Sequence, residues 1–294
     1  MKPRHTEQTE YKKKGNCRER KAGPELLAPA GEFAALKAAV ENGADAVYLG
    51  GKSFSARASA VNFTREELLD AVDYAHLRGV KLYVTLNTLI DSQELDEALE
   101  YAYFLQRIGV DALIIQDLGL LFKLRQVLPE LNLHASTQMT IHNAEGIRFL
   151  QKWGLKRVVL AREVSLEEIR QIREQTDCEI EIFVHGALCI SYSGQCQLSS
   201  LIGGRSGNRG RCAQPCRMVY RLEPGDAEAK PPAKGPAGDS YLLSTRDLNT
   251  LKLLPQIVAA GIASLKIEGR MKRPEYVATV VRTYREALDR LLAN

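Results

Sequence analysis

Long apolar runs are absent from this 294-residue sequence, and their absence excludes a large class of proteins. No stretch of about 18 or more consecutive apolar residues occurs, so the sequence predicts no transmembrane helix. The N-terminal region also lacks the apolar core that a secretory signal requires. Six cysteines without an export signal indicate a reducing compartment, where clustered thiols bind metal more often than they form disulfides. We therefore expect a cytoplasmic protein that does not engage a membrane.

Several well-known catalytic signatures are missing as well. No predicted strand is followed by a GxGxxG or GxxxxGK[ST] phosphate loop, which weighs against a nucleotide-binding fold. The sequence has no HExxH helix of the zinc peptidases and no GxSxG turn of the serine hydrolases.

Positive charge is concentrated at the N-terminus. Residues 1–23 carry eight Lys or Arg and three Glu, a net charge of +5, so the net charge of +4 for the whole sequence leaves −1 for the remainder. The bulk of the protein is therefore not a basic scaffold for nucleic acid. Residues 1–23 are poor in apolar residues, and we predict that they form a disordered basic tail.

From residue 24 to residue 294, short β-branched runs alternate with amphipathic stretches of helical period. Eight such α/β units with short connections favour a closed, TIM-like (β/α)8 barrel over an open doubly wound sheet. The predicted strands cover residues 25–27, 46–49, 81–86, 112–115, 133–136, 157–160, 179–184 and 264–267. The predicted helices cover residues 33–42, 65–78, 93–108, 118–127, 143–153, a stretch after the capping box of Ser165 and Glu168, 247–260 and 274–292.

The seventh predicted strand is not followed directly by a helix. A Cys-, Gly- and Arg-rich stretch comes after it instead, and we predict an insertion over residues 186–240. The Pro-, Gly- and Ala-rich part at 223–239 is typical of a surface loop.

Polar side chains follow most of the predicted strands. In a barrel the C-terminal ends of the strands share one face, and that face carries the chemistry. Together these side chains would bind a polar, anionic small molecule, although each one alone is also explained as a strand-end residue facing water. They are Asn87, Gln116, Ser136, Gln138, Arg162, His185, Lys266, Glu268 and Arg270.

Four cysteines lie in the predicted insertion as a C-x6-C pair and a C-x3-C pair separated by fifteen residues. Structural zinc sites usually pair cysteines about two to four residues apart, which the first pair fits poorly. An iron–sulfur cluster is a larger object and tolerates irregular spacing in a Gly-rich loop, so the pattern favours a cluster over zinc or over four unliganded thiols. Cys17 and Cys178 are interpreted as non-ligands. The candidate ligands are Cys189, Cys196, Cys212 and Cys216.

The same insertion is strongly basic, because no acidic residue occurs between Glu181 and Glu223. Its arginines would either stabilise a negatively charged cluster or bind phosphates of a nucleic acid, and the sequence leaves both roles open. We assign Arg205 and Arg209 to substrate binding. The five arginines are Arg205, Arg209, Arg211, Arg217 and Arg221.

Motifs in a fixed order resemble the collagenase-like peptidase family of unassigned catalytic type, peptidase family U32. They are EIFVHGALC at 181–189 with SYSGQC at 191–196, LAPAG at 27–31, ADAVYLGG at 44–51, STQM at 136–139 with Asn143, and STRDL at 244–248 with KIEGR at 266–270. The resemblance covers residues 24–292. Family members often continue into a C-terminal domain, whereas this sequence ends after the last predicted helix, so we expect a fragment or a minimal form.

The resemblance implies an oxygen-independent hydroxylase with a 4Fe-4S cluster on the four cysteines. Better understood members act on RNA bases or on a quinone precursor, and some use prephenate as the oxygen source. The C-x3-C pair in an Arg- and Gly-rich loop is most similar to the branch that forms 5-hydroxyuridine at the tRNA wobble position. The implied partners are tRNA or another RNA, and a small carboxylate such as prephenate.

Roles for the strand-end residues follow from this chemistry. Lys266, Arg270 and Arg162 would suit the carboxylates of the cosubstrate, and His185 or Glu268 would move protons. The predicted catalytic residues are therefore His185, Glu268 and Lys266.

Three alternatives stay open. A peptidase, as the family name suggests, would pair His185 with Ser191, Ser193 or Cys189 as the nucleophile. The others are a hydroxylase of a quinone precursor and a non-catalytic, cluster-bearing partner in a heterodimer with a sister protein.

Overall fold

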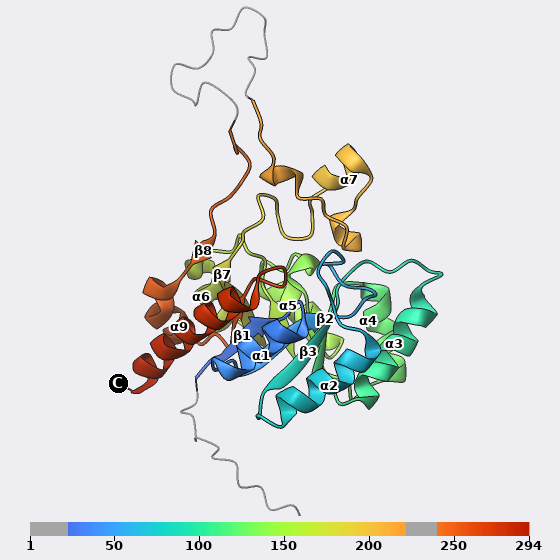
Figure 1. Cartoon of the computed structure of the whole chain (residues 1–294), viewed down its shortest axis with the longest axis horizontal. Coiled ribbons are helices and arrows are strands. Elements are labelled where there is room, and N and C mark those ends of the chain that lie inside the picture. The colour runs from blue at the N-terminus through green and yellow to red at the C-terminus, as the bar shows by residue number, and fades with distance from the viewer. Residues whose placement is uncertain (1–22, 222–239, 294) are drawn as a thin grey trace, which may run out of the picture.

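A computed structural model describes residues 23–221 and 240–293, and in them eight parallel strands close into a barrel surrounded by helices (Figure 1). The ring closes because β9 pairs with both β1 and β7, and β6 pairs with both β5 and β7. The predicted TIM-like (β/α)8 barrel is confirmed. The strands are β1 (Glu25–Pro29), β2 (Ala46–Gly50), β3 (Lys81–Leu86), β4 (Ala112–Ile115), β5 (Leu133–Ala135), β6 (Arg157–Val159), β7 (Glu179–Gly186) and β9 (Ser264–Ile267).

Helices follow the strands, and several of them begin at residues whose side chains cap them. The capping box predicted at Ser165 is present, since its side chain accepts from the Glu168 backbone N–H and Glu168 accepts in return. Thr64 and Glu67 form a second capping box. The helices around the barrel are α1 (Phe33–Glu41), α2 (Arg65–His76), α3 (Leu95–Arg107), α4 (Leu118–Val127), α5 (Ala144–Lys152), α6 (Leu166–Glu174), α8 (Leu254–Ala259) and α9 (Pro274–Ala293).

One helix is shorter than the sequence predicts. The expected helix over 247–260 is reduced to α8, which a two-residue strand, β8 (Leu248–Asn249), precedes; β8 pairs antiparallel with β7. Pro255 lies in the first turn of α8, where its missing N–H is harmless. In the interior of a longer helix the same proline would remove a hydrogen bond and clash with the preceding turn.

Apolar side chains fill two layers of the molecule. The larger layer packs the outer faces of the strands against the helices. A smaller cluster fills the barrel interior, because side chains alternate between the two faces of each strand. Its members are Leu27, Ala46, Tyr48, Tyr83, Ala112 and Ile114.

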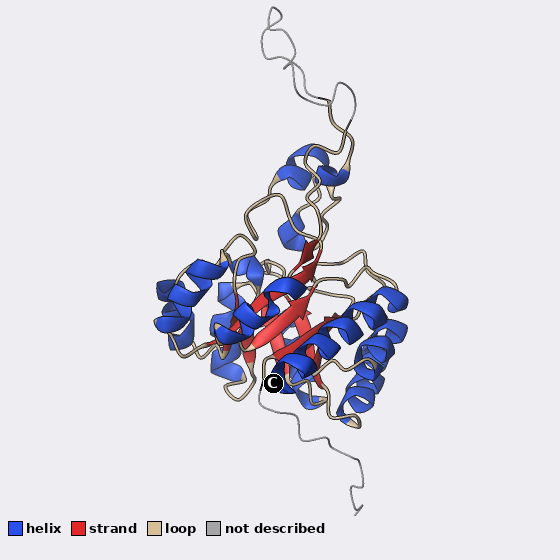
Figure 2. Ribbon diagram, turned by 90° about the vertical axis from the view of Figure 1, so that its left-hand side faces the viewer, coloured by secondary structure: helices blue, strands red, loops and turns tan. Residues whose placement is uncertain are grey.

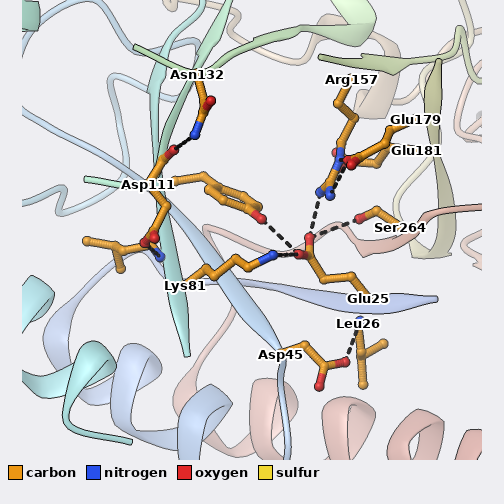
Figure 3. Close-up of polar contacts among 12 residues, drawn as sticks. Glu25, Leu26, Asp45, Lys81, Asp111, Asn132, Arg157, Glu179, Glu181 and Ser264 are labelled. Atoms are coloured by element: carbon orange, nitrogen blue, oxygen red, sulfur yellow. Dashed lines mark hydrogen bonds and ion pairs between the residues drawn. The ribbon is translucent and has the colours of Figure 1, made fainter. Parts of the chain in front are cut away.

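A network of charged side chains lies inside the barrel toward the N-terminal ends of the strands (Figure 3). Arg157 contacts three carboxylates, Glu25 at 2.5 Å, Glu179 at 2.8 Å and Glu181 at 3.3 Å. Glu181 in turn accepts a hydrogen bond from Lys266 Nζ at 2.8 Å. Burial of this kind is tolerated because each charge faces an opposite one. The network therefore connects the base of the barrel to Lys266.

The segment after β7 projects from the end of the barrel where the strands finish (Figures 1 and 2). We call residues 187–221 the cysteine segment. It contains α7 (Leu198–Gly203) and two short 3-10 helices (Gly207–Arg209 and Pro215–Arg217). Of the predicted insertion, residues 222–239 lie outside the described residues, as do residues 1–22 of the predicted tail. Within the described ranges, no helix combines the length and apolar character needed to cross a membrane.

Candidate functional site

A cavity of about 200 Å³ lies between the barrel and the cysteine segment, and we call it the mouth cavity. Its floor includes Tyr48, Thr85, Ile114 and Phe183, which come from β2, β3, β4 and β7. The cysteine segment supplies the opposite wall. The cavity thus occupies the face that carries the chemistry in barrels of this architecture.

Most of the residues selected from the sequence lie around this cavity. Seven strand-end residues converge there from four different strands or from the turns that follow them. All four candidate cysteine ligands line the same cavity. The lining residues from the sequence-based set are Asn87, Ser136, Gln138, Arg162, Lys266, Glu268, Arg270, Cys189, Cys196, Cys212 and Cys216.

His185 does not line the cavity. Its ring packs against Tyr276 and Tyr284 of α9, with centroid distances of 6.0 and 5.5 Å. The pairing of β7 with β9 is irregular between Phe183 and His185, and such a bulge redirects the side chains that follow it. Burial lowers the pKa of His185 below its usual value, which favours the neutral imidazole.

Three other predicted substrate-binding residues lie outside the cavity lining. Gln116 is buried after β4, and its Oε1 has no hydrogen-bond partner among the described residues. Arg209 donates two hydrogen bonds of 2.6 Å to the carboxylate of Glu94, at the start of α3. Arg205 is exposed and its Nε donates to the carbonyl of Arg211 within the cysteine segment. Arg209 therefore fastens the cysteine segment to the barrel.

Glu268 lies between two arginines at the mouth of the barrel. Its carboxylate oxygens are 3.7 Å from Arg57 and 3.5 Å from Arg162. Burial opposes ionisation of this carboxyl, but the surrounding cations outweigh it and hold the pKa of Glu268 below its usual value. Glu268 is therefore a carboxylate at neutral pH and acts as an acceptor of protons or hydrogen bonds.

Arg270 is buried beside the cavity, and only some of its N–H groups have hydrogen-bond acceptors. Its Nη1 donates to Ser55 Oγ at 2.7 Å and to Thr85 Oγ1 at 2.9 Å. Its Nε is buried and has no hydrogen-bond partner among the described residues, and the same is true of Arg162 Nε. Burial lowers the pKa of Arg270 to about 10, so the guanidinium still carries its charge at neutral pH.

Lys266 forms the deepest cationic part of the cavity. Its ammonium lies over the Tyr48 ring at 4.3 Å and bonds to Glu181 behind it. Burial lowers the pKa of Lys266, while Glu181 opposes that change. Glu181 therefore largely balances the positive charge of Lys266. Above Lys266, the two positive charges of Arg57 and Arg162 exceed the single negative charge of Glu268.

Amide and hydroxyl groups form the polar side of the cavity. Asn87 Nδ2 donates to Gln138 Oε1 at 3.0 Å, and Asn87 Oδ1 accepts from the backbone N–H of Ala56 at 3.1 Å. Ser136 Oγ accepts weakly from the same Asn87 amide at 3.4 Å and from the Gln138 backbone N–H at 3.3 Å. These bonds fix the amides of Asn87 and Gln138 in one orientation beside the arginines.

Ser193 attaches the first half of the cysteine segment to the barrel. Its Oγ donates to Glu163 Oε2 at 2.9 Å, and its backbone N–H donates to Glu163 Oε1 at 3.0 Å. His142 Nε2 lies 3.0 Å from the same Oε1. Ser193 is almost completely buried by these contacts. These contacts therefore fix the position of the turn between Cys189 and Cys196 relative to the barrel.

The four cysteines of the segment are free thiols that share one wall of the cavity. Burial raises the pKa of Cys216, and the three neighbouring cysteines raise it further while Arg217 lowers it. Among residues 23–221 and 240–293, no three Cys, His, Asp or Glu side chains are grouped closely enough to hold a metal ion. The thiols thus face a common space without forming a single-ion site.

Gly194 allows the cysteine segment to approach the barrel closely. Its φ is +76°, and an added Cβ would lie 2.1 Å from the carbonyl oxygen of Gln138. We expect Gly194→Ala to lower the free energy of unfolding by about 1–3 kcal/mol, because the backbone must shift or remain strained. Chemical denaturation measures the change. Gly203→Ala is the matched control, since a Cβ there meets no atom within 4 Å; equal losses in the two variants would contradict the prediction.

Some residues of the site were missed by sequence reasoning. Arg57 comes from an irregular loop after β2, where no periodic pattern indicates which side chains turn toward the mouth. Tyr48 lies within a strand and reads as an ordinary core residue. Glu163 directly follows the predicted strand-end residue Arg162, and this adjacency is a sequence signal that could have identified it.

Comparison with known proteins finds relatives with high sequence identity over most of this chain. The "tRNA hydroxylation protein P1" of Bacillus subtilis (strain 168) is 43% identical over 271 residues, which are 92% of this chain and 64% of that protein. The "23S rRNA 5-hydroxycytidine C2501 synthase" of Escherichia coli (strain K12) is 42% identical over 268 residues, 91% of this chain and 40% of that protein. The chain therefore spans less than two thirds of the length of these two relatives.

A solved structure supports the architecture. "The Structure of the U32 Peptidase Mk0906" superposes with a TM-score of 0.53 at 13% identity, covering 86% of this chain and 96% of that one. At this identity the likeness concerns the fold alone. The family model for peptidase family U32 matches residues 31–294. The chain belongs to peptidase family U32.

Proposed function

We propose that this chain is an iron–sulfur-dependent, oxygen-independent RNA hydroxylase that forms 5-hydroxyuridine at the tRNA wobble position with prephenate as cosubstrate. The observation that carries the proposal is the mouth cavity, which is lined by four free cysteines of the cysteine segment and by several cations of the barrel. The names of the two relatives, a tRNA hydroxylation protein and an rRNA hydroxycytidine synthase, support RNA as the substrate class.

The donor set fits a 4Fe-4S cluster better than a single ion. Structural zinc sites usually pair cysteines about two to four residues apart, which the spacing of Cys189 and Cys196 fits poorly. A cluster is a larger object that tolerates such spacing, and all four cysteines line one cavity. Cys189, Cys196, Cys212 and Cys216 would hold the cluster, which when bound supplies one-electron redox chemistry.

The barrel side of the mouth cavity suits a small dicarboxylate. Arg57, Arg162 and Arg270 outnumber the single carboxylate of Glu268, so the upper cavity carries an excess of positive charge. A buried N–H without an acceptor costs about 1–3 kcal/mol, and a carboxylate would satisfy the Nε groups of Arg162 and Arg270. Prephenate, with its two carboxylates, matches this charge.

The geometry favours Glu268 over His185 for proton transfer. Glu268 is an ionised carboxylate that lines the cavity, whereas His185 packs against α9 outside it. Lys266 lies deeper and would orient the cosubstrate or the RNA base by its positive charge. Asn87 and Gln138 offer amide groups for the polar edge of a base.

The geometry supports peptidase chemistry less well. A serine nucleophile needs an imidazole next to its hydroxyl, with the carboxylate on the far side of the imidazole. Here Ser193 Oγ donates directly to the carboxylate of Glu163, and His142 Nε2 contacts the other oxygen of the same carboxylate. His185 is packed against Tyr276 and Tyr284, away from the cavity that Cys189 lines.

Expression in a bacterial strain that lacks its own hydroxylation proteins tests the proposal. We expect 5-hydroxyuridine, measured by mass spectrometry of nucleosides from purified tRNA, to reappear with the unsubstituted chain. Arg270→Gln should reduce the product strongly, because it removes one of the cations of the dicarboxylate site.

Other outcomes would redirect the assignment. A new hydroxylated nucleoside in rRNA alone would change the RNA substrate, and a hydroxylated quinone precursor would change the substrate class. No new hydroxylated product, together with gelatin cleavage by the purified protein, would contradict the hydroxylase and favour the peptidase. Activity restored only by co-expression of a sister protein would favour the cluster-bearing partner.

A further inference from the structure

Three apolar side chains form the rim of the mouth cavity. Ile190, Tyr192 and Met271 all line it, and their exposed fractions are 48%, 65% and 51%. Ile190 and Tyr192 belong to the cysteine segment, whereas Met271 comes from the loop between β9 and α9. Apolar groups exposed at the entrance to a polar cavity mark a surface that is covered when a ligand binds.

Tyr192 is held in place although its ring is exposed. Its neighbour Ser193 is buried and bonded to Glu163 through both its hydroxyl and its backbone N–H. The carbonyl of Tyr192 accepts a hydrogen bond from the backbone N–H of Gln195 at 3.1 Å. One side of the ring faces the imidazole of His142 at a centroid distance of 6.0 Å. The backbone therefore presents the ring without needing the ligand to order it.

The charge of the cysteine segment, which carries Ile190 and Tyr192, indicates the kind of ligand. No acidic residue occurs between Glu181 and Glu223, and Arg205 and Arg211 of the cysteine segment are exposed. Aromatic rings next to a positively charged surface are typical of sites for single-stranded nucleic acid, where bases stack on the rings and cations follow the phosphates. An apolar peptide would gain nothing from these arginines.

We propose that the rim of Ile190, Tyr192 and Met271 is a binding site for an unstacked pyrimidine base of a single-stranded RNA loop, with the base stacked on Tyr192. This inference rests on the proposed RNA substrate and adds where the base is held before it reaches the inner cavity. Ile190 and Met271 flank the base, and the exposed arginines of the cysteine segment attract the phosphates of the RNA strand.

Binding measurements test this site without requiring turnover. Fluorescence anisotropy compares a labelled RNA hairpin with uridines in its loop and a fully paired duplex of the same length. We expect the hairpin to bind more tightly, and Tyr192→Ala to weaken hairpin binding about tenfold because a base–aromatic stack is lost. Tyr192→Phe keeps the ring and should bind like the unsubstituted protein. Tyr103→Ala is the matched control, because Tyr103 is similarly exposed on α3, outside the cavity.

The outcomes separate this inference from the proposed function. Equal hairpin affinity in Tyr192→Ala and the unsubstituted protein overturns the stacking site, and tRNA hydroxylation that persists in that variant leaves the proposed function intact. Equal weakening by Tyr192→Phe also overturns it, because the hydroxyl and not the ring would then bind. Failure of the unsubstituted protein to bind either RNA contradicts the RNA substrate itself. Thermal melting checks that all variants are folded.

Discussion

Replacing Cys189 and Cys196 together with serine should remove nearly all of the iron that anaerobically prepared protein retains. The two residues line one cavity with Cys212 and Cys216, and two remaining thiolates are too few to hold a cluster that takes four. We expect iron to fall from about four atoms per chain to less than about one. Iron and sulfide assays, with the visible absorption of the cluster, measure the change.

Cys178→Ser is the matched control for that experiment. Cys178 is buried, its Sγ contacts the Lys156 carbonyl at 3.5 Å, and it does not line the cavity. Burial raises the pKa of its thiol to about 11, so Cys178 does not supply a thiolate at neutral pH. Equal iron loss in the control, full iron retention in the double variant, or zinc in place of iron would each contradict the cluster assignment.

Replacing Glu181 with glutamine should destabilise the protein by about 3–5 kcal/mol, because it leaves a buried cation without its counter-charge. Glu181 is 0% exposed and contacts both Arg157 and Lys266, and Lys266 has this carboxylate as its hydrogen-bond partner. Arg157 keeps Glu25 as a second partner, so most of the loss should arise at Lys266. Chemical denaturation at pH 7 measures the free energy of unfolding.

Glu179→Gln provides the comparison. Glu179 lies 2.8 Å from the same arginine, but its side chain is 52% exposed, and solvent weakens such a pair. We expect a loss below about 1 kcal/mol there. Similar losses of unfolding free energy in the two variants would show that burial does not determine how much these carboxylates contribute to stability.

The same pair of variants gives a pH dependence with a defined sign. The surrounding cations, Lys266 first, outweigh burial and lower the pKa of Glu181 from 4.5 to about 2. A lowered carboxyl pKa contributes stability that is present above the unfolded value and lost as the pH falls toward the folded value. The unsubstituted protein should therefore lose stability between pH of about 4.5 and about 2, and Glu181→Gln should lose less over that interval.

The architecture and the direction of the active face could be predicted because they depend on local patterns. Alternating strand and helix periods fix the barrel, and strand ends then fall on one face whatever the details of packing. Arg162, Lys266, Glu268 and Arg270 follow this rule and line the cavity. The position of the cysteines after the seventh strand similarly placed them at the mouth.

The exceptions have physical reasons that no local pattern contains. His185 would face the cavity by strict alternation with Phe183, but the irregular pairing of β7 with β9 turns it toward α9. Arg209 bonds to Glu94, a residue 115 positions earlier in the chain. Such partners are fixed only by the tertiary structure. Arg57 joined the site because a loop without periodicity folds over the mouth.

The eight parallel strands make all of their barrel pairings without help from the cysteine segment. That segment leaves from the end of β7 and reaches the opposite side of the mouth, where Leu89 donates its backbone N–H to Asn208 and Ala58 donates to Gly210. Closure of the barrel is thus independent of the segment that carries the four cysteines. Changes in the segment can therefore reshape one wall of the mouth cavity while the barrel beneath it stays closed.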